Sequence, residues 1–195
     1  MDSIDCAKQN IRAIISGSIV PEDPIHAENT LDWLLKLDPE ADQALQIAAL
    51  AHDIDRAVEA QKVRRADFSD YNAFKVAHAH NGARILRAIL NKCGVFKSIA
   101  EEACRLVILH EVGGDPRSDL LKDADSISYF EVNLPWYYQR EGREETIRRC
   151  NWGYRRLSAR MKEVVKTITH KDESITHLLK EVICEQNQHN YDVSG

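Results

Sequence analysis

Apolar residues recur at helical spacing along most of this chain, and few turn-forming residues separate them. Ala27, Leu31, Leu34 and Leu35, for example, fall three or four residues apart or side by side on one helical face. The 195 residues include only 8 Gly and 5 Pro, roughly half the usual combined share. A β-sandwich needs many turns and therefore more of these residues. We predict an all-α, multi-helix bundle.

The breaks in this pattern divide the chain into expected helices. Pro and Gly residues, polar loops and capping residues mark their ends. We expect one helical domain over residues 1–186 and a frayed, disordered tail at 187–195, where apolar residues are scarce. The expected helices cover about 3–17, 26–37, 40–61, 71–91, 98–110 and 120–130, followed by two or three more that are split near 133–135 and near 169.

Charge and cysteine usage exclude several classes of protein. The 26 Lys and Arg against 31 Asp and Glu give a net charge of −5, which disfavours binding of nucleic acid by a basic surface. No apolar run approaches the roughly 18 residues that span a bilayer, and the first residues lack a signal pattern. The 5 Cys form no CxxC pair, so we expect reduced thiols, no thiolate zinc site and a cytoplasmic location. The sequence leaves open whether the chain forms a homodimer.

The pair His52-Asp53 lies inside the most apolar expected helix, in the run Ala-Ala-Leu-Ala-His-Asp. Burying an imidazole and a carboxylate costs several kcal/mol unless both groups are satisfied. A metal ion satisfies both, because it neutralises the carboxylate and accepts the imidazole lone pair. The alternative is a helix end that turns toward solvent and leaves both side chains hydrated.

Three further residues lie in comparable places. His26 opens a helix directly after a loop, His110 closes an apolar helix, and Asp125 lies among residues that must be buried. Each has an ordinary alternative, such as a solvated junction for His26 or a helix-end cation for His110. Together they indicate helices that converge on one polar centre, which is how helical bundles build metal sites.

The ordered set His26, His52-Asp53 and Asp125 resembles the ligand set of the HD superfamily of metal-dependent phosphohydrolases. The resemblance covers about residues 20–135 and implies an HD-type bundle with this metal-site core. It also implies that these four residues bind a metal ion and that Asp53 both ligates the ion and orients the attacking water. A small phosphorylated molecule is the implied substrate.

Further histidines extend the resemblance. His78 lies four residues before Gly82, in an H-x-x-x-G pattern that many HD proteins carry, and His110 occupies a helix end where they often place another His. In relatives these positions hold a second metal or line the substrate pocket. His80 lies about 200° from His78 around a helix, so only one of them can face the site; we favour His78 and keep His80 as the alternative. Mixed nitrogen and oxygen ligands suit one or two ions of Mn, Fe, Co, Ni or Zn, with Mg as a further option.

Basic residues near these motifs are candidates for holding phosphate. Arg56 follows Asp53 by three residues, close to the same helix face, where several HD relatives carry Lys or Arg, and we expect it to be catalytic. Arg64 lies in the short basic run of the following loop, and Lys75 comes one turn before His78. Each of the three has a solvated or surface-paired alternative.

The expected function is hydrolysis of a small phosphoester or phosphoanhydride, of nucleotide-like character, by metal-activated water. The residues that follow His52-Asp53 are Ile-Asp-Arg, so the signatures of the alarmone hydrolases and HD nucleotidases are missing and no particular substrate is indicated. One alternative is a non-catalytic metal- or ligand-binding domain on the same fold. Others are a helical interaction module with incidental histidines and an oxygenase with two iron ions.

Overall fold

The computed structural model describes residues 2–192, with side chains described as far as residue 186. All regular elements of this part are helices, which confirms the all-α prediction. Within it, each helix is too short or too polar to cross a membrane. The chain divides into two compact units, residues 1–125 and 126–195, which we describe separately. The expectation of a single domain stays a prediction.

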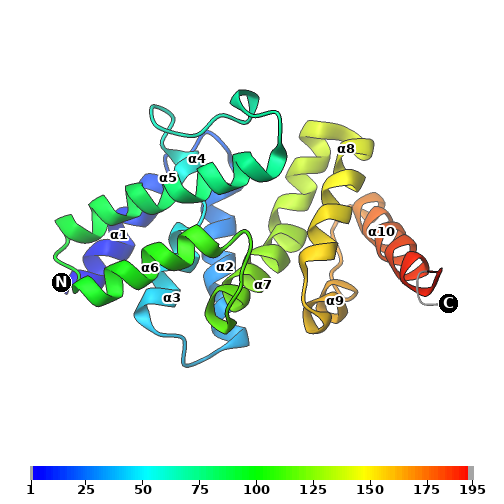
Figure 1. The fold of residues 1–195 in the computed structure, drawn as a ribbon. Coiled ribbons are helices and arrows are strands. Elements are labelled where there is room, and N and C mark those ends of the chain that lie inside the picture. The colour runs from blue at the N-terminus through cyan, green and yellow to red at the C-terminus, as the bar shows by residue number, and fades with distance from the viewer. Residues whose placement is uncertain (1, 193–195) are drawn as a thin grey trace. The chain divides into compact units, whose positions relative to one another are not determined.

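The first unit is built from helices α1 to α6 and most of α7 (Figure 1). Asp side chains cap several of them: Asp2, Asp42 and Asp70 accept hydrogen bonds from backbone N–H groups in the first turns of α1, α3 and α5. The elements are α1 (Ser3–Ile15), α2 (Asp23–Leu37), α3 (Gln43–Ala51), α4 (Ile54–Ala57), a 3₁₀ turn (Arg65–Asp67), α5 (Tyr71–Lys92), α6 (Lys97–Leu109) and α7 (Pro116–Ser128).

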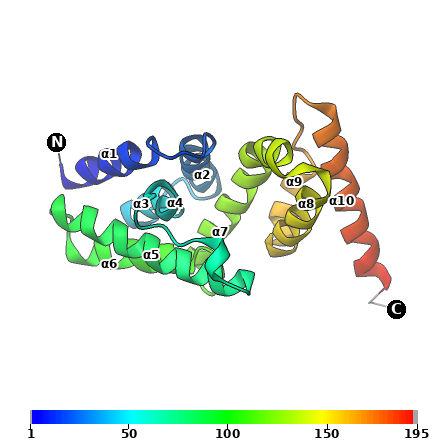
Figure 2. The same cartoon turned by 90° about the horizontal axis from the view of Figure 1, so that it is seen from above.

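Helix α3 lies at the centre of this unit. It packs against α1, α2 and α6, and the long α5 runs beside α6 (Figure 2). The apolar run that suggested a core helix is fully buried, as Ile47 and Leu50 show, and it meets Leu86 of α5 and Leu106 of α6 in one core. Burial of this surface is the main stabilising contribution to the unit. Most of the polar residues discussed below lie at the ends of these helices or at the junctions between them.

The structure corrects the expectation that one helix runs through His52-Asp53. Helix α3 ends at Ala51, His52 is its C-terminal cap, and α4 begins only at Ile54. Asp53 leaves the helical conformation, with φ −103° and ψ 15°. The apolar pattern continues through this break, so spacing alone did not reveal it. The break leaves His52 and Asp53 at a junction between two helices instead of along one helix.

A disulfide corrects the expectation that all thiols are reduced. Cys6 of α1 is bonded to Cys93 at the C-terminal end of α5, with the Cα atoms 5.7 Å apart. Cys104, Cys150 and Cys184 are free. The two bonded residues are 87 positions apart in sequence, so only the packing of α1 on α5 brings them together.

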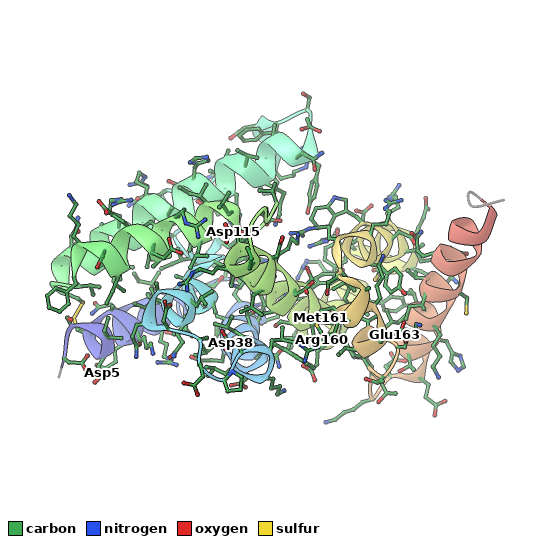
Figure 3. All side chains as sticks on the ribbon, turned by 60° about the horizontal axis from the view of Figure 1, so that its bottom comes forward. Asp5, Asp38, Asp115, Arg160, Met161 and Glu163 are labelled. Carbon is green, nitrogen blue, oxygen red and sulfur yellow. A yellow bond between two sulfur atoms is a disulfide. The ribbon has the colours of Figure 1, made fainter. Side chains whose placement is uncertain are left out.

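The N-terminal end of α7 is fixed by Asp115 (Figure 3). Its Oδ1 accepts hydrogen bonds from the backbone N–H groups of Arg117 and Ser118. Its Oδ2 lies 2.7 Å from Nη1 of Arg105, which belongs to α6. The Arg105 contact holds the pKa of the Asp115 carboxyl well below its usual range. This carboxylate therefore ties the start of the helix that carries Asp125 to α6.

The second unit contains the end of α7, a π-helical turn and three further helices. Helix α10 lies along α8. Gly142 interrupts α8 with φ 78°, a conformation that glycine adopts more easily than other residues, and divides it into two helical stretches. We expected a frayed, disordered tail over residues 187–195. Residues 187–192 belong to α10, and residues 193–195 lie outside the described part of the chain. The elements are the π-turn (Tyr129–Asn133), α8 (Leu134–Arg156), α9 (Ala159–Val165) and α10 (Glu173–Asp192).

Candidate metal centre

Three of the expected ligands meet in one cluster, which we call cluster A: His26, His52 and Asp125. They come from the first turn of α2, the end of α3 and the middle of α7. The Nε2 atoms of His26 and His52 are 3.1 Å apart, and Oδ1 of Asp125 lies 3.2 Å from the first and 3.5 Å from the second. All three residues are buried or nearly so, and their ligand atoms converge on one point.

A second cluster, cluster B, consists of Asp53, His78, His110 and Glu111. Nε2 of His78 lies 2.8 Å from Oδ1 of Asp53, and Nε2 of His110 lies 3.1 Å from Oε1 of Glu111. One ligand atom from each residue lies within 4.8 Å of the others. The residues come from the α3–α4 junction, from α5 and from the end of α6. His80 is exposed on α5 and belongs to neither cluster.

Asp53 lies between the two clusters. Its Oδ1 faces cluster B, at 2.8 Å from Nε2 of His78 and 4.0 Å from Nε2 of His110. Its Oδ2 faces cluster A, at 3.9 Å from Nε2 of His26 and 3.8 Å from Nε2 of His52. A carboxylate in this position can contribute one oxygen atom to each cluster. The helix break at Asp53 provides the backbone geometry for this placement.

Backbone carbonyls determine which imidazole nitrogens are available to a metal. Nδ1 of His52 lies 2.9 Å from the carbonyl oxygen of Ala49, and Nδ1 of His110 lies 2.7 Å from that of Val107. A carbonyl oxygen only accepts, so Nδ1 carries the proton in both rings. In the neutral ring the lone pair is then on Nε2, which faces the cluster. This is the arrangement that metal-binding histidines require.

Asp55 supports His78 in the same way. Oδ2 of this buried carboxylate accepts a hydrogen bond of 2.9 Å from Nδ1 of His78. The carboxylate also accepts hydrogen bonds from Nδ2 of Asn81 and from the backbone N–H of Val63. A carboxylate behind a histidine fixes the ring and raises its basicity as a ligand. Asp55 therefore orients His78 without lying in either cluster.

Arg56 lies behind Asp53 and is held by two carboxylates. Its Nη1 donates to Oδ2 of Asp53 at 2.9 Å, and its Nη2 lies 2.8 Å from Oδ1 of Asp23 on α2. The guanidinium thus links the helix junction to the start of α2. We predicted that Arg56 is catalytic and binds substrate phosphate; in the structure both terminal nitrogens contact protein carboxylates, which makes positioning of Asp53 its direct effect.

The other two basic candidates lie close to residues of cluster B. Lys75 forms an ion pair with Glu111 and is 15% exposed. Arg64 is exposed on the loop between α4 and α5 and lines a cavity that His78 also lines. Lys75 therefore contacts a member of the cluster, and Arg64 lines the same cavity as one.

Electrostatics keeps the carboxylates ionised in spite of their burial. Burial raises the pKa of Asp53, but Arg56 and His52 outweigh it and hold the pKa well below its usual range. Burial also raises the pKa of Asp125, and contacts from His26 and His52 again prevail. The pKa of His26 is lowered by its burial. Burial also lowers the pKa of His52, but the charges of Asp53 and Asp125 outweigh this effect and raise the pKa to about 9.

The donor set fits a transition-metal ion. It offers four imidazole nitrogens and three carboxylates, the mixture that Mn, Fe, Co, Ni and Zn accept and that Ca does not favour. The side chains of Asp53 and Asp125 are 14% exposed, whereas those of His52 and His110 are 0% exposed. The clusters thus reach solvent on the carboxylate side. The residues present are suited to hold metal in either cluster.

The comparison with protein families gives one match. A family described as "Domain of unknown function (DUF4202)" matches residues 2–178. The chain belongs to this family. No curated protein and no solved structure matches the chain. The domain of this family therefore includes all the residues of both clusters, and their chemistry has to be inferred from the geometry above.

Two carboxylates of the site were not predicted. Glu111 directly follows His110 after a buried helix, so it repeats the imidazole–carboxylate pair of His52-Asp53; this repetition was a usable signal in the sequence. Asp55 was noted only as a departure from other families. Its partners lie 8 and 23 residues away in sequence, and no local pattern marks them.

Proposed function

We propose that this domain is a metal-dependent phosphohydrolase acting on a small phosphoester or phosphoanhydride, such as a nucleotide. The observation that carries the proposal is the position of Asp53, with one oxygen toward each of two histidine-containing clusters. The order of His26, His52-Asp53 and Asp125, which resembles the HD superfamily, supports the same chemistry. When bound, divalent ions supply a polarised phosphoryl oxygen and a more acidic water.

The charge of the site supports an anionic substrate. Asp53, Glu111 and Asp125 contribute three negative charges, whereas neutral histidines contribute none. Two divalent ions would contribute four positive charges and leave a net charge of +1, before Lys75 and Arg56 are considered. A phosphoryl group can approach such a site without repulsion.

The residues around the clusters have separable roles in this proposal. Asp53 orients the attacking water, because its carboxylate faces both clusters. Arg56 positions Asp53 through the 2.9 Å contact to its Oδ2. We assign to Lys75, which pairs with Glu111 and is partly exposed, a contact with a phosphoryl oxygen or the leaving group. Asp55 holds the ring of His78.

Elemental analysis and an activity screen test the proposal. Purified protein is analysed for bound metal and then assayed, with added Mn²⁺ or Co²⁺, against a panel of nucleotide and sugar phosphates. We expect His52→Ala and Asp53→Ala to lose both metal and turnover. His80→Ala is the matched control, because it removes an exposed histidine of α5 that belongs to neither cluster.

Two outcomes would contradict the proposal in different ways. Stoichiometric metal without turnover on the whole panel would favour a non-catalytic metal-binding domain. No metal uptake, together with no thermal shift on addition of divalent ions, would favour an interaction module whose histidines are incidental.

A further inference from the structure

The loop between α4 and α5 lines an open cavity next to cluster B. The cavity has a volume of about 410 Å³, within the range of small-molecule sites. His78 forms part of its wall, so the cavity adjoins the proposed reaction centre. Its lining includes Arg56, Lys62, Arg64, Arg65, Phe74 and His78.

Asp55 fixes this loop relative to the metal centre. Its carboxylate accepts hydrogen bonds from the backbone N–H of Val63, at 3.2 Å, and from Nδ1 of His78, at 2.9 Å. Val63 lies between Lys62 and Arg64, so the same buried carboxylate anchors the middle of the basic run and a cluster B residue. The backbone that carries the basic side chains is therefore anchored beside the cluster.

Three of the four cations in the cavity wall have partners of their own. Arg56 contacts Asp53 and Asp23, and Lys62 lies 2.5 Å from a carboxylate oxygen of Glu59. Arg65 donates to the carbonyl oxygen of Phe68 and lies 5.7 Å from the ring centre of Tyr71.

Arg64 differs from these three. It makes no ion pair with another described residue, although it lines a cavity that contains only one carboxylate, Asp55, and that carboxylate is already engaged. A guanidinium in this position can bind an anion through two parallel hydrogen bonds. Phe74 adds an apolar wall for an organic part of the same ligand.

We propose that this cavity binds a second anionic group of the substrate, so that the substrate class is small molecules with two phosphoryl groups. One group would lie at the metal centre, a placement that rests on the proposed function, and the other would be bound by Arg64, with Lys62 and Arg65 adding positive charge. The cavity adjoins His78, so the two groups would be near neighbours in the molecule, as in a diphosphate or a bisphosphate.

Calorimetric titration with inorganic pyrophosphate and, separately, with inorganic phosphate tests the cavity directly. The protein is first incubated with Mn²⁺ and freed of excess ion, and its metal content is measured. We expect pyrophosphate to bind more tightly than phosphate, and Arg64→Ala to weaken pyrophosphate binding about tenfold, the effect of losing a charge-assisted contact. Arg64→Lys should restore part of the affinity.

Arg87→Ala is the matched control. It removes one exposed arginine from α5, outside the cavity, and changes the net charge by the same amount. Equal effects of Arg64→Ala and Arg87→Ala, or equal affinities for pyrophosphate and phosphate, would overturn the proposal. Binding of pyrophosphate that depends on Arg64, in a protein that hydrolyses neither phosphoesters nor phosphoanhydrides, would refute the proposed function and leave the cavity assignment standing.

If the protein hydrolyses phosphate compounds, its kinetics can test the second phosphoryl site independently of the proposed function. Here kcat/KM for a nucleoside diphosphate is divided by kcat/KM for the corresponding monophosphate in each variant. We expect this ratio to fall about tenfold in Arg64→Ala. A metal-dependent hydrolase whose ratio is the same in Arg64→Ala and Arg87→Ala would keep the proposed function and reject the second phosphoryl site.

Discussion

The Nε2 atoms of His26 and His52 face each other at 3.1 Å, with a carboxylate oxygen of Asp125 at 3.2 Å from the first. Two buried imidazole nitrogens at this separation need a proton or a cation between them. Because the three residues come from α2, the end of α3 and α7, a cation bound here would join three helices of the first unit. Metal binding should therefore stabilise the fold as well as support chemistry.

The first prediction concerns cluster A. Saturating Mn²⁺ or Zn²⁺, at about 100 times the dissociation constant, should stabilise the protein by about 2.7 kcal/mol, or about 5–10 °C in Tm. His52→Ala should remove the part of this shift that comes from cluster A, whereas His80→Ala should retain the whole shift. Differential scanning fluorimetry with and without the ion measures both. An undiminished shift in His52→Ala would place the stabilising ion elsewhere.

The second prediction concerns cluster B. Glu111→Gln keeps the size of the side chain but removes the charge that faces His110 and Lys75. We expect the variant to bind one ion less than the wild type, or to bind the second ion at least about tenfold more weakly. Metal content after equilibrium dialysis measures this. Glu101→Gln, an exposed position on α6, is the control and should bind metal as the wild type does.

The third prediction separates the two clusters through Asp55. The carboxylate of this residue accepts hydrogen bonds from His78, Asn81 and Val63, and none of these belongs to cluster A. Asp55→Asn should weaken the ion in cluster B by about 10–100-fold, the usual effect of removing a carboxylate behind a histidine ligand. The affinity of cluster A for its ion should change much less, and only through the carboxylate of Asp53 that faces both clusters. Competition with a fluorescent chelator resolves the two affinities, and equal weakening of both ions would contradict the separation.

The fourth prediction concerns the disulfide. Cys6 and Cys93 are 87 positions apart, so the bond closes a long loop and restricts the unfolded chain. Cys93→Ser should lower the free energy of unfolding by about 2–4 kcal/mol. Urea denaturation measures the change. Cys184→Ser, at a free and exposed thiol, should leave the midpoint within experimental error, and addition of reductant should lower the wild-type midpoint to that of Cys93→Ser.

The fifth prediction concerns acid stability and Asp115. Its folded-state pKa lies below the unfolded value of 3.8, because Arg105 and the backbone of α7 stabilise the ionised form. The stabilisation is therefore complete above pH 4 and is lost as the pH falls from there toward the folded-state pKa. Asp115→Asn should be less stable than the wild type by at most about 1 kcal/mol at pH 7, and this difference should shrink at pH 2.

Denaturation at the two pH values measures the Asp115 difference. Asp32→Asn, an exposed position on α2, controls for the change in net charge. A destabilisation by Asp115→Asn that stays constant from pH 7 to pH 2 would show that the capping hydrogen bonds, and not the contact with Arg105, account for the effect.

The helices could be predicted because their signals are local. The expected helix at 71–91 is observed as Tyr71–Lys92, since apolar spacing fixes its face and Asp70 caps its first turn. The break at His52-Asp53 carries no Gly or Pro. There the backbone departs from the helical conformation at Asp53, whose carboxylate faces both clusters. These contacts join residues that are distant in sequence, so local sequence signals do not predict the break.

The candidate site was predictable where a residue's own surroundings were unusual. His52 and His110 follow buried apolar runs, and burial of an imidazole needs an explanation that sequence alone can raise. The role of Asp55 and the pairing of Cys6 could not be predicted, because both depend on contacts between helices that are far apart in sequence. The pairing of Cys6 with Cys93 also shows that the number of cysteines does not determine which of them meet.

The position of Asp53 has a consequence for how the protein takes up metal. A cation in cluster A would draw charge from the same carboxylate that serves cluster B, and would also fix its orientation. The two occupancies are therefore thermodynamically linked, and linkage is reciprocal. Whatever factor the first ion imposes on the affinity of the second, the second imposes equally on the first. A metal titration of this domain should depart from the curve of two independent sites, and neutralising Asp53 should remove the coupling together with the shared ligand.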